Sequence, residues 1–176
     1  MTLDSTTPIE VPTAGRYRID PRRSTLAYTG KHLFGLGTVH ATFEILSGEV
    51  VVADPVEETT VSAVVDAGSF SSGNARRDRD VTGPGLLDSD AHPEIRFTCS
   101  GCRQDGDRWL LGGTVTAHGA SVPVELAVDR CVREGSGMRV HARAEHLDRH
   151  AFGVTGSRGM VGRHLDLDLD VVADPA

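Results

Sequence analysis

The cysteines of this sequence are the first candidates for chemistry, because two of them stand at a spacing that metal sites use. Cys99 and Cys102 form a C-x-x-C pair, as in a zinc knuckle. No second pair follows, and a single C-x-x-C outside a βαβ context is a weak signal. Cys131 brings the total to three, an odd number that argues against a disulfide framework. We therefore expect reduced, structural thiols.

The histidines do not complete a ligand set either. His146 and His150 are four residues apart, but their segment alternates like a strand and lacks the H-E-x-x-H pattern of a zinc helix. His118 and His164 fall at polar positions of the alternation. No serine, cysteine or aspartate stands in a context typical of an activated nucleophile. The sequence predicts no metal, no cofactor and no catalytic residue, so the protein is not expected to be an enzyme.

One histidine falls at an apolar position. His32 shares the alternation phase of Leu26, Tyr28 and Phe34, so its side chain is expected to point inward. A buried imidazole needs a hydrogen-bond partner. That partner is either the head group of a ligand or a neighbouring tyrosine or serine in an ordinary core.

Three arginines are the remaining charged candidates. Arg76, Arg77 and Arg79 follow one another closely, and at the mouth of a barrel they would suit a phosphate or carboxylate head group. Asp78 and Asp80 are interleaved with them. The alternative is therefore that the five charges neutralise one another on the surface.

The elements that must position these residues are strands. In the run LDLDLD, Leu165, Leu167 and Leu169 point to one side of an extended chain and the aspartates to the other. The same alternation recurs at residues 38–45, 121–129 and 137–145, and more briefly near 60 and 95. Turn signals stand at residues 46–49, 104–107, 118–121 and 134–137. Eight or nine half-buried antiparallel strands are expected, in a closed barrel that removes exposed edges or in a sandwich with much the same pattern.

The strand rhythm breaks near residues 71–90. The chain from Asn74 to Asp80 favours a turn or two of helix, which the Gly83-Pro84-Gly85 run ends. Long irregular segments in compact domains are often lids or binding loops. A solvated surface excursion is the alternative.

Size and composition limit the remaining choices. At 176 residues with a net charge of −7 and no long basic run, the chain is expected to form one domain without nucleic acid as a partner. The first fifteen residues hold no Lys or Arg and no apolar run of signal-peptide length, so a cytoplasmic protein without stable membrane insertion is expected. Residues 1–14 are expected to be a flexible tail and residues 15–173 the barrel domain.

The volume of the inward side chains determines whether the barrel is hollow. Aromatic residues make up only 5% of the chain, and the inward positions are rich in Val, Ala and Gly. An eight-stranded barrel can be filled by side chains or can hold one small ligand. Small side chains favour a cavity, although a flattened barrel could pack them solidly.

The order of several segments resembles one known family. These are YRIDPRRSTLAYTGKHLFG, VHATF, SFSSGNARRDRDV, HPEIRFTCSG, LGGTVTAHGASVPVEL and HLDRHAFGV. Together they are similar to the YceI-like family, over about residues 15–173. The resemblance implies an all-β fold, a closed antiparallel eight-stranded lipocalin-like barrel, and His32 matches the family's strand histidine. It also implies binding of a polyisoprenoid or related long amphiphile, and a homodimer, since relatives are often dimers.

Some positions depart from the family pattern. Arg23 stands where members commonly carry a histidine, Leu86 and Leu87 stand in place of phenylalanines, and Ala41 replaces a glycine. These changes leave the fold expectation intact. The identity of the bound lipid does not carry over.

We therefore expect non-catalytic binding or carriage of a long apolar amphiphile, of polyisoprenoid, isoprenoid quinone or fatty-acyl type. The alternatives are an enzyme acting on a small apolar substrate in the cavity and a protein-interaction module with a filled barrel. Leu86 and Leu87 are candidates for a lid. The expected pocket wall comprises Leu26, Tyr28, His32, Phe34, Phe43, Phe97, Val140 and Phe152.

Overall fold

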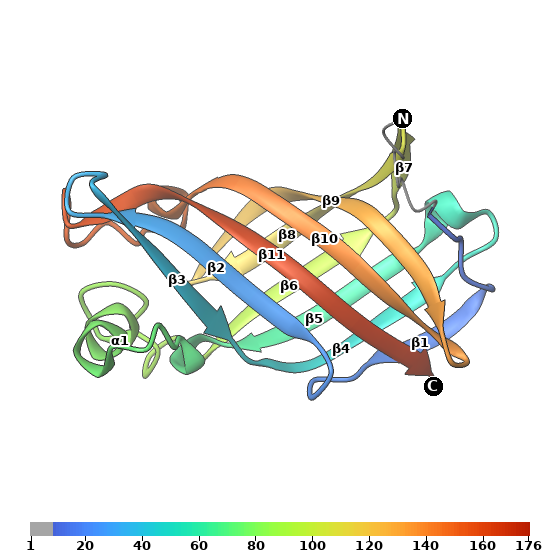
Figure 1. Cartoon of the computed structure of the whole chain (residues 1–176), viewed down its shortest axis with the longest axis horizontal. Helices are drawn as coiled ribbons and strands as arrows, with labels where there is room; N and C mark the ends of the chain where they lie inside the picture. Colours follow the sequence, from blue (N-terminus) through green and yellow to red (C-terminus); the bar gives the residue numbers. More distant parts are fainter. Residues whose placement is uncertain (1–8) are drawn as a thin grey trace, which may run out of the picture.

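The alternating segments form eleven strands of one antiparallel sheet in the computed structural model, which describes residues 9–176. The sheet closes on itself because β1 pairs with both β4 and β11 (Figure 1). The strands are β1 (Gly15–Ile19), β2 (Thr25–His32), β3 (Gly37–Phe43), β4 (Ile45–Val52), β5 (Thr60–Asp66), β6 (Glu94–Ser100), β7 (Arg103–Asp105), β8 (Arg108–Ala117), β9 (Ala120–Glu134), β10 (Gly137–Asp148) and β11 (Val161–Pro175).

The closed circuit contains eight strands. It runs through β1, β4, β5, β6, β8, β9, β10 and β11 and returns to β1. The strands β1 and β2 follow one another along the same edge of β11, while β3 continues beside β2 and β4 beside β1. The predicted closed eight-stranded antiparallel barrel is confirmed, and the sandwich alternative is excluded.

Three of the four predicted turns are correct and one is wrong. The turns near residues 104–107, 118–121 and 134–137 join β7 to β8, β8 to β9 and β9 to β10. Residues 46–49 instead lie inside β4. Gly48 allows close packing there, because an added Cβ would meet the terminal methyl group of Ile19. The Ser-Gly pair therefore marks a close approach of two strands and not a reversal.

The predicted insertion forms a short cap at one end of the barrel. It consists of the 3-10 turn η2 (Ala67–Ser69) and the helix α1 (Ala75–Thr82). The side chain of Asn74 caps this helix by accepting a hydrogen bond from the Arg77 backbone N–H at 3.1 Å. The predicted helix over residues 74–80 is confirmed. Figure 1 shows α1 at the end of the barrel opposite β1 and the C-terminus.

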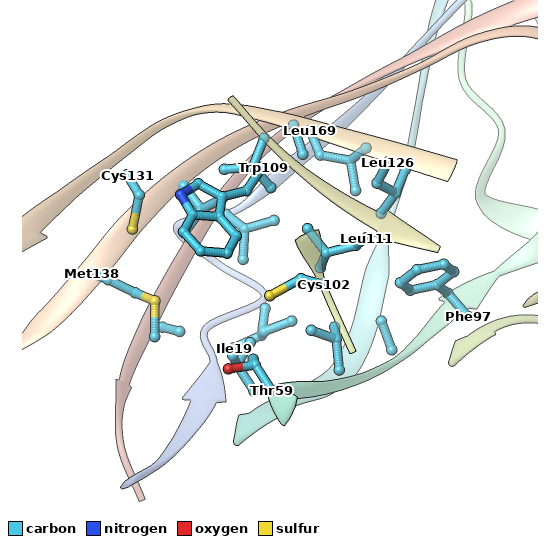
Figure 2. Close-up of a pocket in the computed structure, with 18 of the residues that line it drawn as sticks. Ile19, Thr59, Phe97, Cys102, Trp109, Leu111, Leu126, Cys131, Met138 and Leu169 are labelled. Carbon is cyan, nitrogen blue, oxygen red and sulfur yellow. The ribbon is translucent and has the colours of Figure 1, made fainter. Parts of the chain in front are cut away.

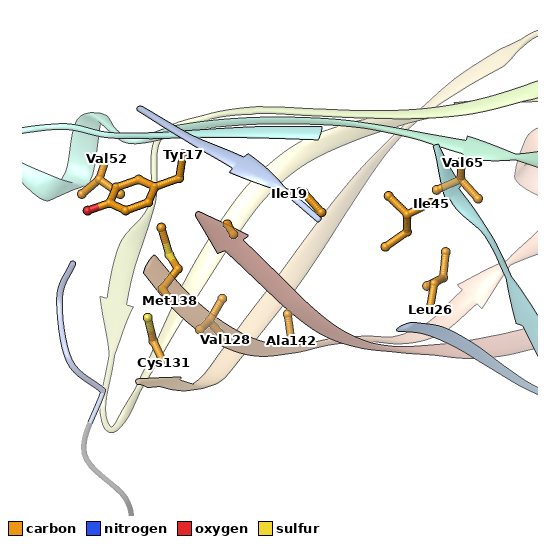
Figure 3. Packing of buried hydrophobic residues seen from close by; sticks show 11 residues of the cluster. Tyr17, Ile19, Leu26, Ile45, Val52, Val65, Val128, Cys131, Met138 and Ala142 are labelled. Carbon is orange, nitrogen blue, oxygen red and sulfur yellow. The ribbon is translucent and has the colours of Figure 1, made fainter. Parts of the chain in front are cut away.

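The interior divides into a main cluster and two smaller ones near the α1 end. The main cluster surrounds Tyr17, Ile19 and Met138 and extends to Leu26 and Ile45 (Figure 3). The second cluster is built around Leu86, Ala117, Ala144, Phe152 and Val154, and the third around Val39, Ala41 and Phe70.

The predicted N-terminal tail is partly wrong. Residues 1–8 lie outside the described part of the chain. The segment at residues 9–12 lies against the barrel, where the backbone N–H of Glu10 donates to the Cys131 carbonyl at 2.8 Å. Ile9 packs on the main cluster. The Glu10 hydrogen bond and the side chain of Ile9 hold the segment, whereas Val11 remains 53% exposed.

None of the helices in the described residues is long and apolar enough to cross a bilayer.

Candidate ligand cavity

A cavity of about 230 Å³ occupies the part of the barrel away from α1. It begins under the N-terminal segment at residues 9–12 and reaches inward to Phe97 and Leu167. Figure 2 shows Trp109, Cys102, Cys131 and Met138 gathered around this space.

The wall of the cavity is almost entirely apolar. Besides Trp109 and Cys131, the uncharged side chains of the wall that carry polar atoms are Thr59 and Cys102, and backbone groups bond both of them. The Thr59 hydroxyl accepts from the Ala53 N–H at 3.1 Å, and the Cys102 thiol donates to the Val56 carbonyl at 3.2 Å. A guest would therefore meet hydrocarbon and not hydrogen-bonding groups along most of its length.

The alternation in β11 explains how the sequence builds this wall. Leu167, Leu169, Val171 and Ala173 line the cavity. The intervening carboxylates face outward, where Asp168 accepts a hydrogen bond from Arg143 Nε at 3.1 Å. Two leucines of the LDLDLD run, Leu167 and Leu169, are thus part of the cavity wall, whereas Leu165 is not.

Of the ten residues predicted to contact a ligand, three line the cavity. Leu26, Phe97 and Val140 do so from β2, β6 and β10. The other seven lie elsewhere, because the barrel is hollow only over part of its length. They are Tyr28, His32, Phe34, Phe43, Leu86, Leu87 and Phe152.

Tyr28 and Phe43 pack against an aromatic ring from the insertion. Phe70 enters the barrel from the segment after η2, with ring centroids 5.3 Å from Tyr28 and 5.4 Å from Phe43, both edge to face. Burial raises the pKa of the Tyr28 hydroxyl. This end of the barrel is therefore filled by Phe70, which the alternation of β2 and β3 does not reveal.

The inward orientation expected for Phe34 is wrong. Strand β2 ends at His32, and Leu33 and Phe34 adopt left-handed backbone conformations with φ of 51° and 57°. The alternation stops with the strand, so Phe34 is 79% exposed and lies beside Gly159. The His32 imidazole lies against Gly37 and outside the cavity wall.

The second cluster closes the inner end of the cavity. Leu86 and Phe152 are buried in it, and Leu87 packs against it. Leu126 and Leu167 belong to the cavity wall and also pack on this cluster. The two leucines proposed as a lid are therefore part of a packed floor.

A buried arginine that sequence reasoning missed supports this floor. Arg149 is 6% exposed, and its guanidinium donates to the carbonyls of Val154, Gly162 and Val161 at 2.8, 2.9 and 3.0 Å. Burial lowers its pKa. Its side chain ties η3 (Arg149–Phe152) to the start of β11. The sequence did not indicate these hydrogen bonds, because the accepting groups are backbone carbonyls, which every residue carries.

The three arginines proposed for a head group are on the wrong end for this cavity. Arg76, Arg77 and Arg79 belong to α1, which lies at the end of the barrel opposite β1 (Figure 1), and none of the three lines the cavity. Arg77 Nε donates to the Ser72 hydroxyl at 2.9 Å. Arg77 therefore stabilises the insertion, whereas Arg76 and Arg79 are exposed on the helix.

The cysteines have the properties expected of structural thiols. All three are free, and Cys99 and Cys131 are buried. Burial raises the pKa of each thiol, that of Cys131 to about 11. A protonated thiol is a poor nucleophile and a poor metal ligand.

The structure also brings together three metal-ligand side chains that were not predicted as a set. Asp88, His92 and His118 lie at the α1 end, with one potential ligand atom from each within 4.8 Å of the others. No short sequence motif contains all three residues, because His118 is distant from Asp88 and His92 along the chain.

Comparisons with known proteins agree with this architecture. A UPF0312 protein of Photorhabdus laumondii is 23% identical over 116 residues, covering 64% of this chain but only 60% of the relative's length. Protein YceI of Shigella flexneri is 23% identical over 167 residues, covering 90% of this chain and 86% of the relative.

Two solved structures share the fold. Burkholderia cenocepacia BcnA superposes with a TM-score of 0.78 at 19% identity, covering 88% of this chain and 98% of that one. A polyisoprenoid binding domain from Saccharophagus degradans, implicated in plant cell wall breakdown, superposes with a TM-score of 0.69 at 14% identity, covering 93% and 100%. The YceI-like domain model matches residues 17–173, the span of the closed barrel, and the chain therefore belongs to the YceI-like family.

Proposed function

We propose that this protein binds and carries a long, slim apolar molecule of polyisoprenoid, isoprenoid quinone or fatty-acyl type, without transforming it. The observation that carries the proposal is the cavity of about 230 Å³ with its hydrocarbon wall. This volume lies just below the roughly 300–1,000 Å³ typical of small-molecule pockets. A flexible chain suits it better than a broad ring system does.

The binding energy would come from removal of the chain from water. Each buried CH₂ contributes at most about 0.8 kcal/mol before the cost of association. No polar contact is needed along the chain. Since the packed floor around Leu86 and Phe152 closes the inner end, the tail would point toward α1 and the polar head would remain near Glu10 at the mouth.

The solved domain from Saccharophagus degradans supports this ligand class, because it is described as polyisoprenoid binding and shares the barrel. The low sequence identity of 14% leaves the particular lipid to be identified by experiment.

The wall chemistry supports carriage over catalysis. Glu10 is the one charged residue among the described residues of the wall, and the raised pKa of Cys131 keeps its thiol protonated. An acid–base reaction needs a positioned proton donor and acceptor. The cavity also weakens the alternative of a filled barrel that serves only as an interaction module.

We further propose that the protein acts in a reducing compartment such as the cytoplasm, where its three free thiols would remain reduced. A homodimer is part of the same proposal, on the family resemblance alone. Light scattering of the purified protein tests the dimer.

Native mass spectrometry of freshly purified protein tests the binding proposal. We expect a co-purifying mass of a few hundred daltons, lost on organic extraction, and uptake of a fluorescent isoprenoid or fatty-acyl probe by the extracted protein. The Phe34→Ala variant is a negative control, because this ring is 79% exposed and outside the cavity. It should retain the guest and take up the probe as the parent does. Absence of both a co-purifying guest and probe uptake would refute the proposal.

A further inference from the structure

We propose that Asp88, His92 and His118 form a binding site for a divalent transition metal of the zinc class, at the end of the barrel opposite the cavity mouth. Their potential ligand atoms lie within 4.8 Å of one another, and all three side chains are half-buried. Two imidazoles and one carboxylate are ligands that zinc accepts. The site would fasten the loop after α1 to the hairpin between β8 and β9.

The loop presents the first two ligands from a single turn of chain. The backbone N–H of His92 donates to the Asp88 carbonyl at 2.9 Å, and that of Ala91 donates to the same oxygen at 3.1 Å. This i,i+4 geometry places the Asp88 and His92 side chains on one side of the turn. The backbone N–H of Asp88 donates to the Gly83 carbonyl at 2.8 Å, which holds the turn against the end of α1.

The third ligand comes from a tight hairpin. His118 and Gly119 are the two residues between the paired Ala117 and Ala120, with φ of 53° and 75°, as a type I′ turn requires. The His92 ring lies over Gly119, where an added Cβ would come within 3.3 Å of it. The centroids of the two imidazole rings are 4.9 Å apart.

A hydrogen bond favours one tautomer of the neutral His118 ring. Its Nδ1 lies 3.1 Å from the Phe152 carbonyl oxygen, and because a carbonyl only accepts, Nδ1 must carry the proton. In the neutral ring the lone pair is then on Nε2, free to bind a metal. A histidine ligand whose other nitrogen donates to a carbonyl is the usual arrangement around protein-bound zinc.

The fit requires a modest contraction. Ligand atoms around tetrahedral zinc are roughly 3.4 Å apart, given metal–ligand bonds of about 2.0–2.2 Å. Rotation of the half-buried Asp88 and His92 side chains would supply the difference. Three protein ligands leave a fourth position for water.

Titration of chelator-treated, untagged protein with Co²⁺ and Zn²⁺ tests the site. We expect one ion per chain, the visible absorption of tetrahedral Co²⁺, and a higher melting temperature with Zn²⁺. The variants His92→Gln and His118→Asn should each weaken binding at least about tenfold. Asparagine is chosen because it tolerates the left-handed backbone of residue 118.

Two histidine controls make the assignment specific. His40→Gln, at an exposed position on β3, should bind like the parent. His146 and His164 stack with ring centroids 3.9 Å apart, so His146→Gln tests a competing histidine pair and should also leave binding unchanged. Non-saturable binding, or loss of binding in His146→Gln but not in His92→Gln, would overturn the proposal. Because these residues lie outside the cavity wall, probe uptake reports separately on the carrier function.

Discussion

Leu169 lies directly opposite Ala142 where β11 pairs with β10, and both side chains line the cavity. A large residue and a small one thus face each other across the ladder, and the space above the small one belongs to the cavity. The volume available to a guest depends on such small wall residues.

Enlarging Ala142 should therefore impair binding more than folding. We expect Ala142→Phe to lose most probe uptake while its melting temperature stays within a few degrees of the parent. Ala41→Phe is the matched control, since Ala41 is equally small but packs against Phe70 in a filled region. There the added ring is overpacking and should cost about 1–3 kcal/mol of unfolding free energy. Equal stability losses in the two variants would show that the interior near Ala142 is solid.

The two faces of β11 should differ sharply in their tolerance of charge. Leu167→Asp places a carboxylate in the hydrocarbon wall without a partner, so little folded protein is expected. Asp168→Asn retains an acceptor for His141 and Arg143 on the outer face and should cost less than about 1 kcal/mol. Urea unfolding of both variants measures the difference. A similar midpoint for the two would reverse the assignment of faces.

The N-terminal segment should govern access to the cavity. Ile9, Val11 and Pro12 form part of the wall at the mouth. Hydrogen bonds of the Glu10 and Thr13 backbone and the packing of Ile9 hold this segment. Removal of residues 1–13 should speed both entry and release of the probe in stopped-flow measurements. Removal of residues 1–8 alone keeps this wall and should leave the rates close to those of the full chain. Unchanged rates in the longer deletion would place the entrance elsewhere.

The stability of the barrel should depend on pH through His141. Burial lowers its pKa, but hydrogen bonds to Asp129 and Asp168 and the charges of these residues raise it by more, so the net pKa is above its ordinary value. A raised folded pKa means that the stabilisation is complete below about pH 6.5, the unfolded value, and is lost as the pH rises through the folded pKa.

We therefore expect the unfolding free energy to fall by up to about 1 kcal/mol between pH 6.5 and 7.5, since partly exposed pairs are screened. His141→Gln should flatten this change. Above about pH 7.5 the thiols of the unfolded chain ionise before the buried ones and lower the stability independently of His141. His150, whose pKa desolvation lowers, affects stability only below about pH 6.5 and does not interfere. Equal slopes for parent and variant in urea unfolding between pH 6.5 and 7.5 would exclude the role of His141.

Local patterns were sufficient for most strands and their faces, although they misplaced a turn inside β4 and the side chain of Phe34. The alternation of Leu167 and Leu169 with the aspartates of β11 shows directly which side chains face inward, because successive residues of a strand point to opposite faces. Leu26, Phe97 and Val140 were placed on the cavity wall by the same reasoning. The run from Asn74 to Asp80, ended by Gly83-Pro84-Gly85, likewise indicated α1.

Only the tertiary structure decides how far along the barrel axis each inward side chain lies. Tyr28 has the inward phase of Leu26 but meets Phe70, which returns from the insertion after more than forty residues. The cluster of Asp88, His92 and His118 likewise depends on a loop and a hairpin that meet at one end. A period of two specifies the face of a strand, whereas the depth at which the interior is hollow or filled depends on long-range register and on which distant side chains occupy it.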